Sequence, residues 1–231
     1  MKYTGIKNRI IDARQTDDGL ILEDCIGVTI SNWTIHGGSP NLLLLNCHGC
    51  SIVNCHFANP ANKPDESGNG PHSILLDKCI NCEVSGCHVT RLKYTEMGIG
   101  LYMCQSCSVL RNTINGQSVR QSADAITVDY GSKNCRVSGN YIDLTYLGHK
   151  SGHKGVVVGS GTGHVVELGS GGIIGSVEDH PLSVASYYDA AGNPLEDDTD
   201  PSAAPVSATI IGFKKDLVYV GPRCSVKFQG V

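Results

Sequence analysis

The chain has 231 residues, enough for one large domain or for one domain with a small appendage. Its formal net charge is −4 and it contains no run of Lys and Arg, which argues against a nucleic-acid-binding surface. No apolar run approaches the roughly 18 residues of a transmembrane helix, and the N-terminus lacks the apolar core of a signal peptide. We therefore expect no membrane insertion and no export by the ordinary secretory route.

Short apolar strands and a similar following segment recur along the first two thirds of the chain. The strands are predicted to begin at Leu20, Leu42, Ile74, Ile99, Ile126 and Val156. The segments are C-I-G-V-T-I-S-N-W-T-I, C-H-G-C-S-I-V-N-C-H-F, C-I-N-C-E-V-S-G-C-H-V, C-Q-S-C-S-V-L-R-N-T-I and K-N-C-R-V-S-G-N-Y-I. Strict alternation within each unit predicts strands with one buried face. Stacked units without helices between them are typical of a parallel β-helix, whose coils bury one another.

Aligning the segments places most of the cysteines in columns with other residues. The columns are Val28, Cys50, Cys82, Cys107, Cys135 and Trp33, Cys55, Cys87, Asn112, Asn140. C-x-x-C pairs have the spacing of a zinc site, and stacked cysteines also permit disulfides. The column neighbours favour a third interpretation, reduced thiols packed inward as small apolar side chains, with no metal bound.

Two further columns predict turns and surface. Asn and Gly tolerate the left-handed backbone of a sharp turn, so a turn is predicted at Asn32, Asn54, Gly86, Arg111 and Gly139. The histidines between the cysteines are predicted to face outward, at His48, His56 and His88.

The repeats resemble those of right-handed parallel β-helix proteins with the pectin-lyase-like fold, over roughly residues 5–160. This resemblance implies an all-β chain with about six coils in residues 1–160. Residues 161–231 carry an acidic stretch and two or three strands, and are predicted to form a C-terminal β-rich capping or oligomerisation region. The open ends of a β-helix need such a cover.

Candidate site residues lie where loops join the strands, because loops on a rigid scaffold commonly carry function. The longest loops are residues 58–72, 90–97 and 115–124. The junction residues predicted to stack are Asp18, Pro40, His72, Met97, Asp124 and His153. Glu96 and Asp124 on adjacent coils would lie about 5–8 Å apart and could serve as general acid and base on a glycosidic bond, with His153 assisting.

Three more residues could bind sugar hydroxyls or acidic groups: His72, Arg120 and Lys154. The alternative is that all of these are polar turn residues on the surface. The stretch A-D-A-I-T-V-D-Y-G, with S-G-H-K-G-V-V-V-G-S after it, is similar to the polygalacturonase region with paired aspartates and a catalytic histidine. Asp124 and His153 match that pattern in position, but Ala123 stands where the other aspartate would be.

A β-helix followed by a small β region also resembles phage tailspikes and other virion appendages. This resemblance implies a structural or adhesive viral surface protein, either a tailspike-like appendage or a capsid decoration protein. It would form a homo-oligomer, with a trimer favoured, and contact other virion proteins or a surface polysaccharide. It would reside on the virion surface after cytoplasmic assembly, or be secreted.

The alternative function is a polysaccharide-degrading glycoside hydrolase or lyase acting beside the coil loops. No cofactor is expected in either case.

Overall fold

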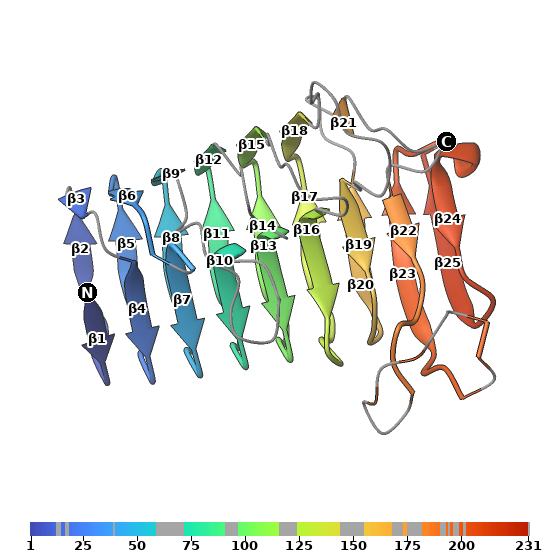
Figure 1. Ribbon diagram of the computed structural model, residues 1–231, viewed down its shortest axis with the longest axis horizontal. Helices are drawn as coiled ribbons and strands as arrows, with labels where there is room; N and C mark the ends of the chain where they lie inside the picture. The colour runs from blue at the N-terminus through green and yellow to red at the C-terminus, as the bar shows by residue number, and fades with distance from the viewer. Residues whose placement is uncertain are drawn as a thin grey trace.

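The computed structural model describes residues 1–12, 15–16, 19–38, 40–58, 72–90, 97–115, 124–143, 155–167, 173–174, 182–189, 193, 195, 199–200 and 202–230. Within these ranges the chain winds through three parallel sheets, and each coil lies beside the preceding one along the long axis (Figure 1). The described helical structure is one 3-10 turn, η1 (Lys215–Leu217), and no described helix is long and apolar enough to cross a membrane.

We call the sheets 1, 2 and 3. Sheet 1 contains β1 (Lys2–Thr4), β4 (Leu20–Glu23), β7 (Leu42–Leu45), β10 (His72–Asp77), β13 (Met97–Tyr102), β16 (Asp124–Asp129), β19 (Val156–Val158), β22 (Leu182–Val184) and β24 (Val218–Val220). Sheet 2 contains β2 (Ile10–Asp12), β5 (Thr29–Ser31), β8 (Ser51–Val53), β11 (Glu83–Ser85), β14 (Ser108–Leu110), β17 (Arg136–Ser138), β20 (His164–Glu167), β23 (Val206–Ile211) and β25 (Cys224–Gln229). Sheet 3 contains β3 (Gln15–Thr16), β6 (Thr34–His36), β9 (His56–Ala58), β12 (His88–Thr90), β15 (Thr113–Asn115), β18 (Tyr141–Asp143) and β21 (Ile173–Ile174).

The register of sheet 1 matches the repeat alignment. The predicted strand starts pair in sequence, Leu20 with Leu42, then Ile74, Ile99, Ile126 and Val156. Every one of these side chains is almost fully buried. Since a one-residue slip would turn each buried side chain outward, the inward aliphatic residues fix this register. The predicted parallel β-helix is confirmed.

The predicted turn column is also confirmed. These residues join sheet 2 to sheet 3 and adopt positive φ: Asn32 (58°), Asn54 (54°), Gly86 (62°), Arg111 (53°) and Gly139 (67°). The three histidines behave as expected, because His48 and His88 are exposed and His56 is half-buried.

The cysteine columns point inward, as predicted, but they do more than fill space. All eleven cysteines lie in the described residues as free thiols, and ten of them are buried. The Cys82 thiol donates to the Cys47 carbonyl (3.5 Å) and accepts the Cys50 N–H (3.3 Å). Cys82, Cys87 and Cys107 each thereby satisfy one donor and one acceptor of the coil before them, which buried backbone requires.

This double role explains the asparagines and the histidine that share a column with cysteine, whereas Val28 and Trp33 at the N-terminal ends of the columns do not have it. Asn112 donates to the Val84 carbonyl (3.0 Å) and accepts the Cys87 N–H (2.9 Å). His164 continues the other column, because its Nδ1 accepts the Cys135 N–H (3.3 Å). Burial lowers the pKa of His164, which favours its neutral form. Thiol, amide and neutral imidazole side chains are interchangeable here because each both donates and accepts.

The coils extend further than the sequence analysis predicts. Strands β22 and β24 continue sheet 1, and β23 and β25 continue sheet 2, all with parallel pairing. The sequence hides this continuation because β20 and β23, although adjacent in sheet 2, are separated by a long insertion, and no C-x-x-C segment marks the later coils. Residue 160 is therefore not the end of the sheets, and a capping or oligomerisation role for residues 161–231 stays a prediction.

Candidate functional site

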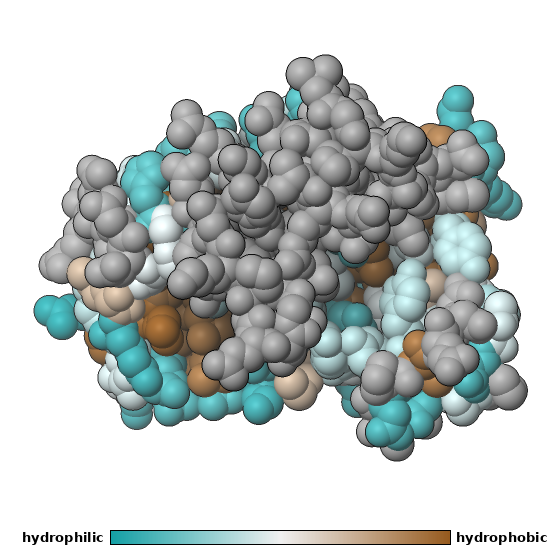
Figure 2. Space-filling view, in the orientation of Figure 1, coloured by the Kyte–Doolittle hydropathy of each residue, from teal (hydrophilic) through white to brown (hydrophobic). Residues whose placement is uncertain are grey.

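The outer face of sheet 1 carries two rows of side chains, because residues alternate between the core and the outside along each strand. The first row, in register, is Ile21, Leu43, Leu75, Gly100, Thr127, Val157, Ser183 and Tyr219. The second row is Glu23, Leu45, Asp77, Tyr102 and Asp129. Figure 2 shows apolar surface in the region of β4 and β7, where both rows are largely aliphatic. From β10 onward the second row becomes acidic and aromatic.

Two carboxyl groups flank Tyr102 in the second row. Asp77 and Asp129 pair with Tyr102 from the strands on either side, so their Cα atoms lie two strand spacings, about 10 Å, apart. The Oδ1 atom of Asp77 is buried and, in the part of the chain that the structure describes, has no hydrogen-bond partner. Burying a polar atom without a hydrogen-bond partner lowers the stability of the fold, so Asp77 is a candidate functional residue.

Asp129 has the more perturbed environment. Its side chain is 6% exposed, and its Oδ1 accepts the Tyr130 N–H at 2.7 Å. Burial raises the pKa of Asp129 to about 6, because desolvation disfavours the charged form. A carboxyl group that keeps its proton in mildly acidic solution can act as a general acid.

Tyr102 also contacts His72, which was predicted as a binding residue. The Tyr102 hydroxyl lies 3.0 Å from His72 Nε2, and the two rings meet edge to face with centroids 5.5 Å apart. A Cβ atom on Gly100 would lie 3.4 Å from His72 Cδ2, so the imidazole rests on the outer face over this glycine. His72 therefore contacts the tyrosine that lies between Asp77 and Asp129 in the register, and its binding role stays a prediction.

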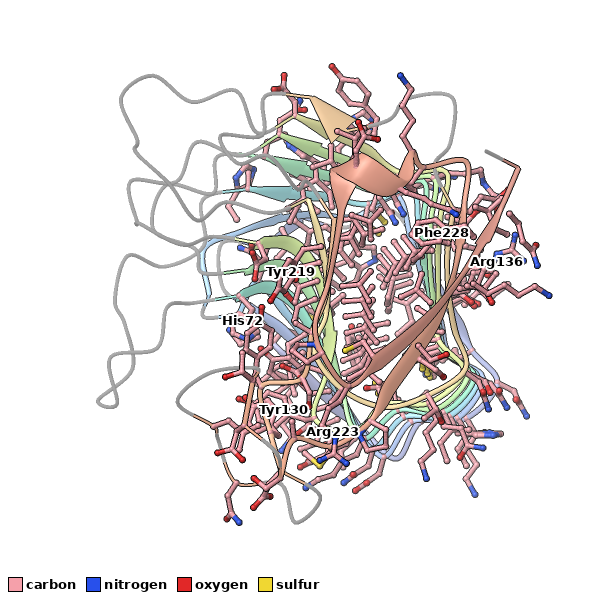
Figure 3. All side chains as sticks on the ribbon, turned by 90° about the vertical axis from the view of Figure 1, so that its right-hand side faces the viewer. His72, Tyr130, Arg136, Tyr219, Arg223 and Phe228 are labelled. Carbon is pink, nitrogen blue, oxygen red and sulfur yellow. The ribbon has the colours of Figure 1, made fainter. Side chains whose placement is uncertain are left out.

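An aromatic row crosses the coils from this point. The ring centroids of Tyr102 and Tyr130 are 4.4 Å apart, and those of Tyr130 and Tyr188 are 4.8 Å apart. Burial, the Tyr130 hydroxyl and the Asp129 charge raise the pKa of Tyr188. In the view along the helix axis, His72 and Tyr130 lie on one side of the stack and Arg136 lies on the opposite side (Figure 3). The row thus forms one continuous surface, on the side where Asp77 and Asp129 lie.

Of the other predicted site residues, the structure describes Asp124. It is the first residue of β16, it is half-buried, and it pairs with Met97, which pairs with His72. The stacking predicted for these three junction residues is confirmed. Four predicted residues lie outside the described ranges, Glu96, Arg120, His153 and Lys154, and their roles stay predictions.

Sequence reasoning missed Asp77, Tyr102 and Asp129, although a signal was present. In the aligned strands I-L-L-D, I-G-L-Y and I-T-V-D, the fourth position is polar or aromatic where an outward row must fall. Tyr188 had no comparable signal, because it follows β22 outside the recognisable repeats. Among the described residues, no group of three or more His, Cys, Asp or Glu side chains is arranged to hold a metal ion.

Comparison with known proteins decides the family. Residues 2–168 match the family described as "Right handed beta helix region". The chain belongs to this family. The predicted right-handed parallel β-helix is confirmed by this match together with the three parallel sheets.

No curated protein matches this chain. Among solved structures, an alginate lyase from Paenibacillus sp. str. FPU-7 is similar at 12% sequence identity and a TM-score of 0.34. That alignment covers 96% of this chain and 94% of the lyase chain.

Proposed function

We propose that this β-helix binds a polysaccharide along the outer face of sheet 1 and hydrolyses a glycosidic bond there. The observation that carries this proposal is the in-register placement of Asp77 and Asp129 on either side of Tyr102. Two carboxyl groups roughly 6.5–9.5 Å apart are the arrangement of inverting glycosidases, in which a water molecule fits between base and sugar. A Cα separation of about 10 Å is compatible with that spacing.

The environments assign the two roles. Asp129, with its pKa raised to about 6, holds a proton and donates it to the glycosidic oxygen. That bond breaks, and its electron pair stays on the protonated leaving oxygen. Water then attacks the anomeric carbon from the opposite side and gives its proton to the carboxylate of the half-buried Asp77.

The aromatic row supports a sugar ligand over a peptide or a nucleic acid. Tyr102, Tyr130 and Tyr188 present inclined aromatic rings that also carry hydroxyl groups, which suits the apolar faces and hydroxyls of sugar rings. The net charge of −4 disfavours a phosphate backbone.

The test is a panel of neutral and acidic polysaccharides incubated with the wild type and with Asp129→Asn. We expect the wild type to release reducing ends and the variant to lose roughly 10²–10⁴-fold in rate while still co-sedimenting with the polysaccharide. Activity should fall as the pH rises above about 6, because Asp129 loses its proton. No release by the wild type, or full activity in the variant, would contradict the proposal. An unsaturated product would instead indicate a lyase, with the His72–Tyr102 pair exchanging the protons.

A second candidate is the structural or adhesive viral surface protein that the sequence analysis favours. The same aromatic row supports this candidate, because it would bind a surface polysaccharide without cleaving a glycosidic bond. This candidate requires tight polysaccharide binding without bond cleavage, a trimeric mass in solution, and co-sedimentation with virus particles. A monomer that binds no particle would contradict it.

A further inference from the structure

The carboxyl group of Asp129 lies directly against the next coil of the stack. Val128 pairs with Val158 across β16 and β19, so Gly159 follows in register beside Asp129. A Cβ atom on Gly159 would lie 2.7 Å from Cγ and Oδ2 of Asp129 and 2.8 Å from its Oδ1. These distances are too short for a packed side chain, so any residue larger than glycine at this position would displace the carboxyl group.

Ser160, the next residue of that coil, adds a polar contact to the same carboxyl group. Its side chain is buried, and its hydroxyl oxygen accepts the Gly131 N–H at 2.5 Å. Burial raises the pKa of Asp129, and hydrogen bonds from the Tyr130 N–H and from the Ser160 hydroxyl oppose that rise, because they stabilise the charged form. Two successive coils therefore each supply one donor to Asp129.

A buried histidine holds the backbone of Ser160 in place. The Nδ1 atom of His164 accepts the Cys135 N–H, so the neutral imidazole carries its proton on Nε2. This Nε2 donates to the Ser160 carbonyl at 3.1 Å. Burial lowers the pKa of His164, which favours this neutral form. The column of buried cysteines thus continues into a residue that fixes the turn beside Asp129.

Tyrosines face Asp129 from the surrounding elements. Tyr102 pairs with it from β13, Tyr130 follows it in the chain, and Tyr188 packs on Tyr130 from the segment after β22. Burial, the Tyr130 hydroxyl and the Asp129 charge together raise the pKa of Tyr188. Tyrosine hydroxyls ordinarily titrate near pH 10, so a titration of this cluster near pH 6 reports Asp129.

We propose that Gly159 and Ser160 are positioning residues for Asp129. Gly159 leaves the space that the carboxyl group occupies, and Ser160 orients the carboxyl group by donating a hydrogen bond to it. The catalytic meaning of this arrangement rests on the proposed function, in which Asp129 gives its proton to the glycosidic oxygen. The inference adds what controls that step: Ser160 makes the proton easier to release, and both residues fix the direction in which it leaves.

The experiment follows the carboxyl carbon of Asp129 by NMR through a pH titration of the whole protein, without polysaccharide. Ser160→Ala should raise the pKa of Asp129 by about 1, because the charged form loses one hydrogen bond. Ser160→Thr keeps the hydroxyl group and should keep the wild-type pKa. Ser207→Ala is the matched control, since the Ser207 hydroxyl accepts the N–H of another turn glycine, Gly163, at 3.0 Å. It should leave the pKa of Asp129 unchanged.

The same variants are then compared for hydrolysis of a polysaccharide. In Ser160→Ala the loss of activity with rising pH should move upward by about 1, together with the pKa of Asp129. Gly159→Ala should lower the rate by roughly 10–100-fold, because its Cβ atom displaces the carboxyl group from its position. Ser207→Ala should change neither property, and circular dichroism checks the folding of every variant.

The inference is overturned if Asp129 has the same pKa in the wild type and in Ser160→Ala, or if Gly159→Ala leaves the titration of Asp129 unchanged. Ser160→Cys is a second variant of similar size whose thiol is a weaker donor, and it should raise the pKa by a smaller amount. A raised pKa in a protein that cuts no polysaccharide contradicts the proposed hydrolysis alone. Hydrolysis by a protein whose Asp129 does not respond to Ser160 contradicts this inference alone.

Discussion

The first coils and the middle coils of sheet 1 share an inner face but differ on the outside. Inside, Leu22 and Leu101 are equally buried and belong to the same core. Outside, the second row changes from Glu23 and Leu45 to the acidic and aromatic residues that begin with Asp77. Since the backbone and register are the same in both regions, the fold does not require this change. The proposed polysaccharide site would account for the change.

The largest expected difference between the first and the middle coils comes from removing one second-row carboxylate from each. We expect Asp77→Asn to lower the rate of polysaccharide hydrolysis by roughly 10²–10⁴-fold, because the water molecule loses its base. Glu23→Gln in the same row should change the rate less than about twofold, since Glu23 is engaged with Lys2 at 2.5 Å. Equal losses in the two variants would remove the distinction between the regions.

Adjacent residues of one strand separate the inner face from the outer face. Ile74 is fully buried and Leu75 is half-buried on the outside. Ile74→Ala should lower the free energy of unfolding by about 2–5 kcal/mol, and Leu75→Ala by less than about 1.5 kcal/mol. Chemical denaturation measures both values. A Leu75→Ala variant as unstable as Ile74→Ala would show that the outer aliphatic patch is part of the core.

The pH dependence of stability should reveal the free-energy cost of burying the charged form of Asp129. Its pKa rises from 3.8 in the unfolded chain to about 6 in the folded protein, so its stabilising contribution is full below pH 3.8 and is lost as the pH rises through about 6. Asp129→Asn should therefore stabilise the protein by up to about 3 kcal/mol at pH 8 and by very little at pH 4. Denaturation of both proteins at the two pH values checks this. An equal effect of the substitution at both values would mean that burial does not perturb this carboxyl group.

The smallest expected effect is on the affinity for polysaccharide when a residue of the second row of sheet 1 is replaced. Tyr102→Ala should weaken polysaccharide binding about tenfold, because it interrupts the aromatic surface between His72 and Tyr130. Leu45→Ala, at the equivalent position two strands earlier, should leave affinity unchanged. Affinity electrophoresis in polysaccharide-containing gels compares the two, and a larger effect of Leu45→Ala would place the binding surface over the first coils.

The sequence predicts the stacked coils well because each coil repeats the same local requirements. Alternation identifies buried residues such as Ile74, and the Asn and Gly column identifies the turns. The site is harder to predict, since alternation shows that Asp77 and Asp129 face outward but not that they flank one tyrosine. That arrangement depends on the register between separate coils. Tyr188 reaches Tyr130 from outside the recognisable repeats, so no local pattern predicts the contact.

At the buried corners, backbone N–H groups donate to side chains of the next coil, and those side chains donate back to carbonyl groups of the preceding coil. The N–H of Cys55 donates to the Cys87 sulfur (3.4 Å), that of Cys87 to Asn112 (2.9 Å) and that of Asn112 to Asn140 (2.9 Å). Each coil thus relies on the next coil to satisfy its amide. Shortening the chain from its C-terminal side would leave a buried N–H without an acceptor at the new end. Shortening it from the N-terminal side would leave a buried side-chain donor, such as the Asn112 amide, without its carbonyl acceptor. Each coil is therefore completed by both of its neighbours, and the stack loses hydrogen bonds wherever it is cut.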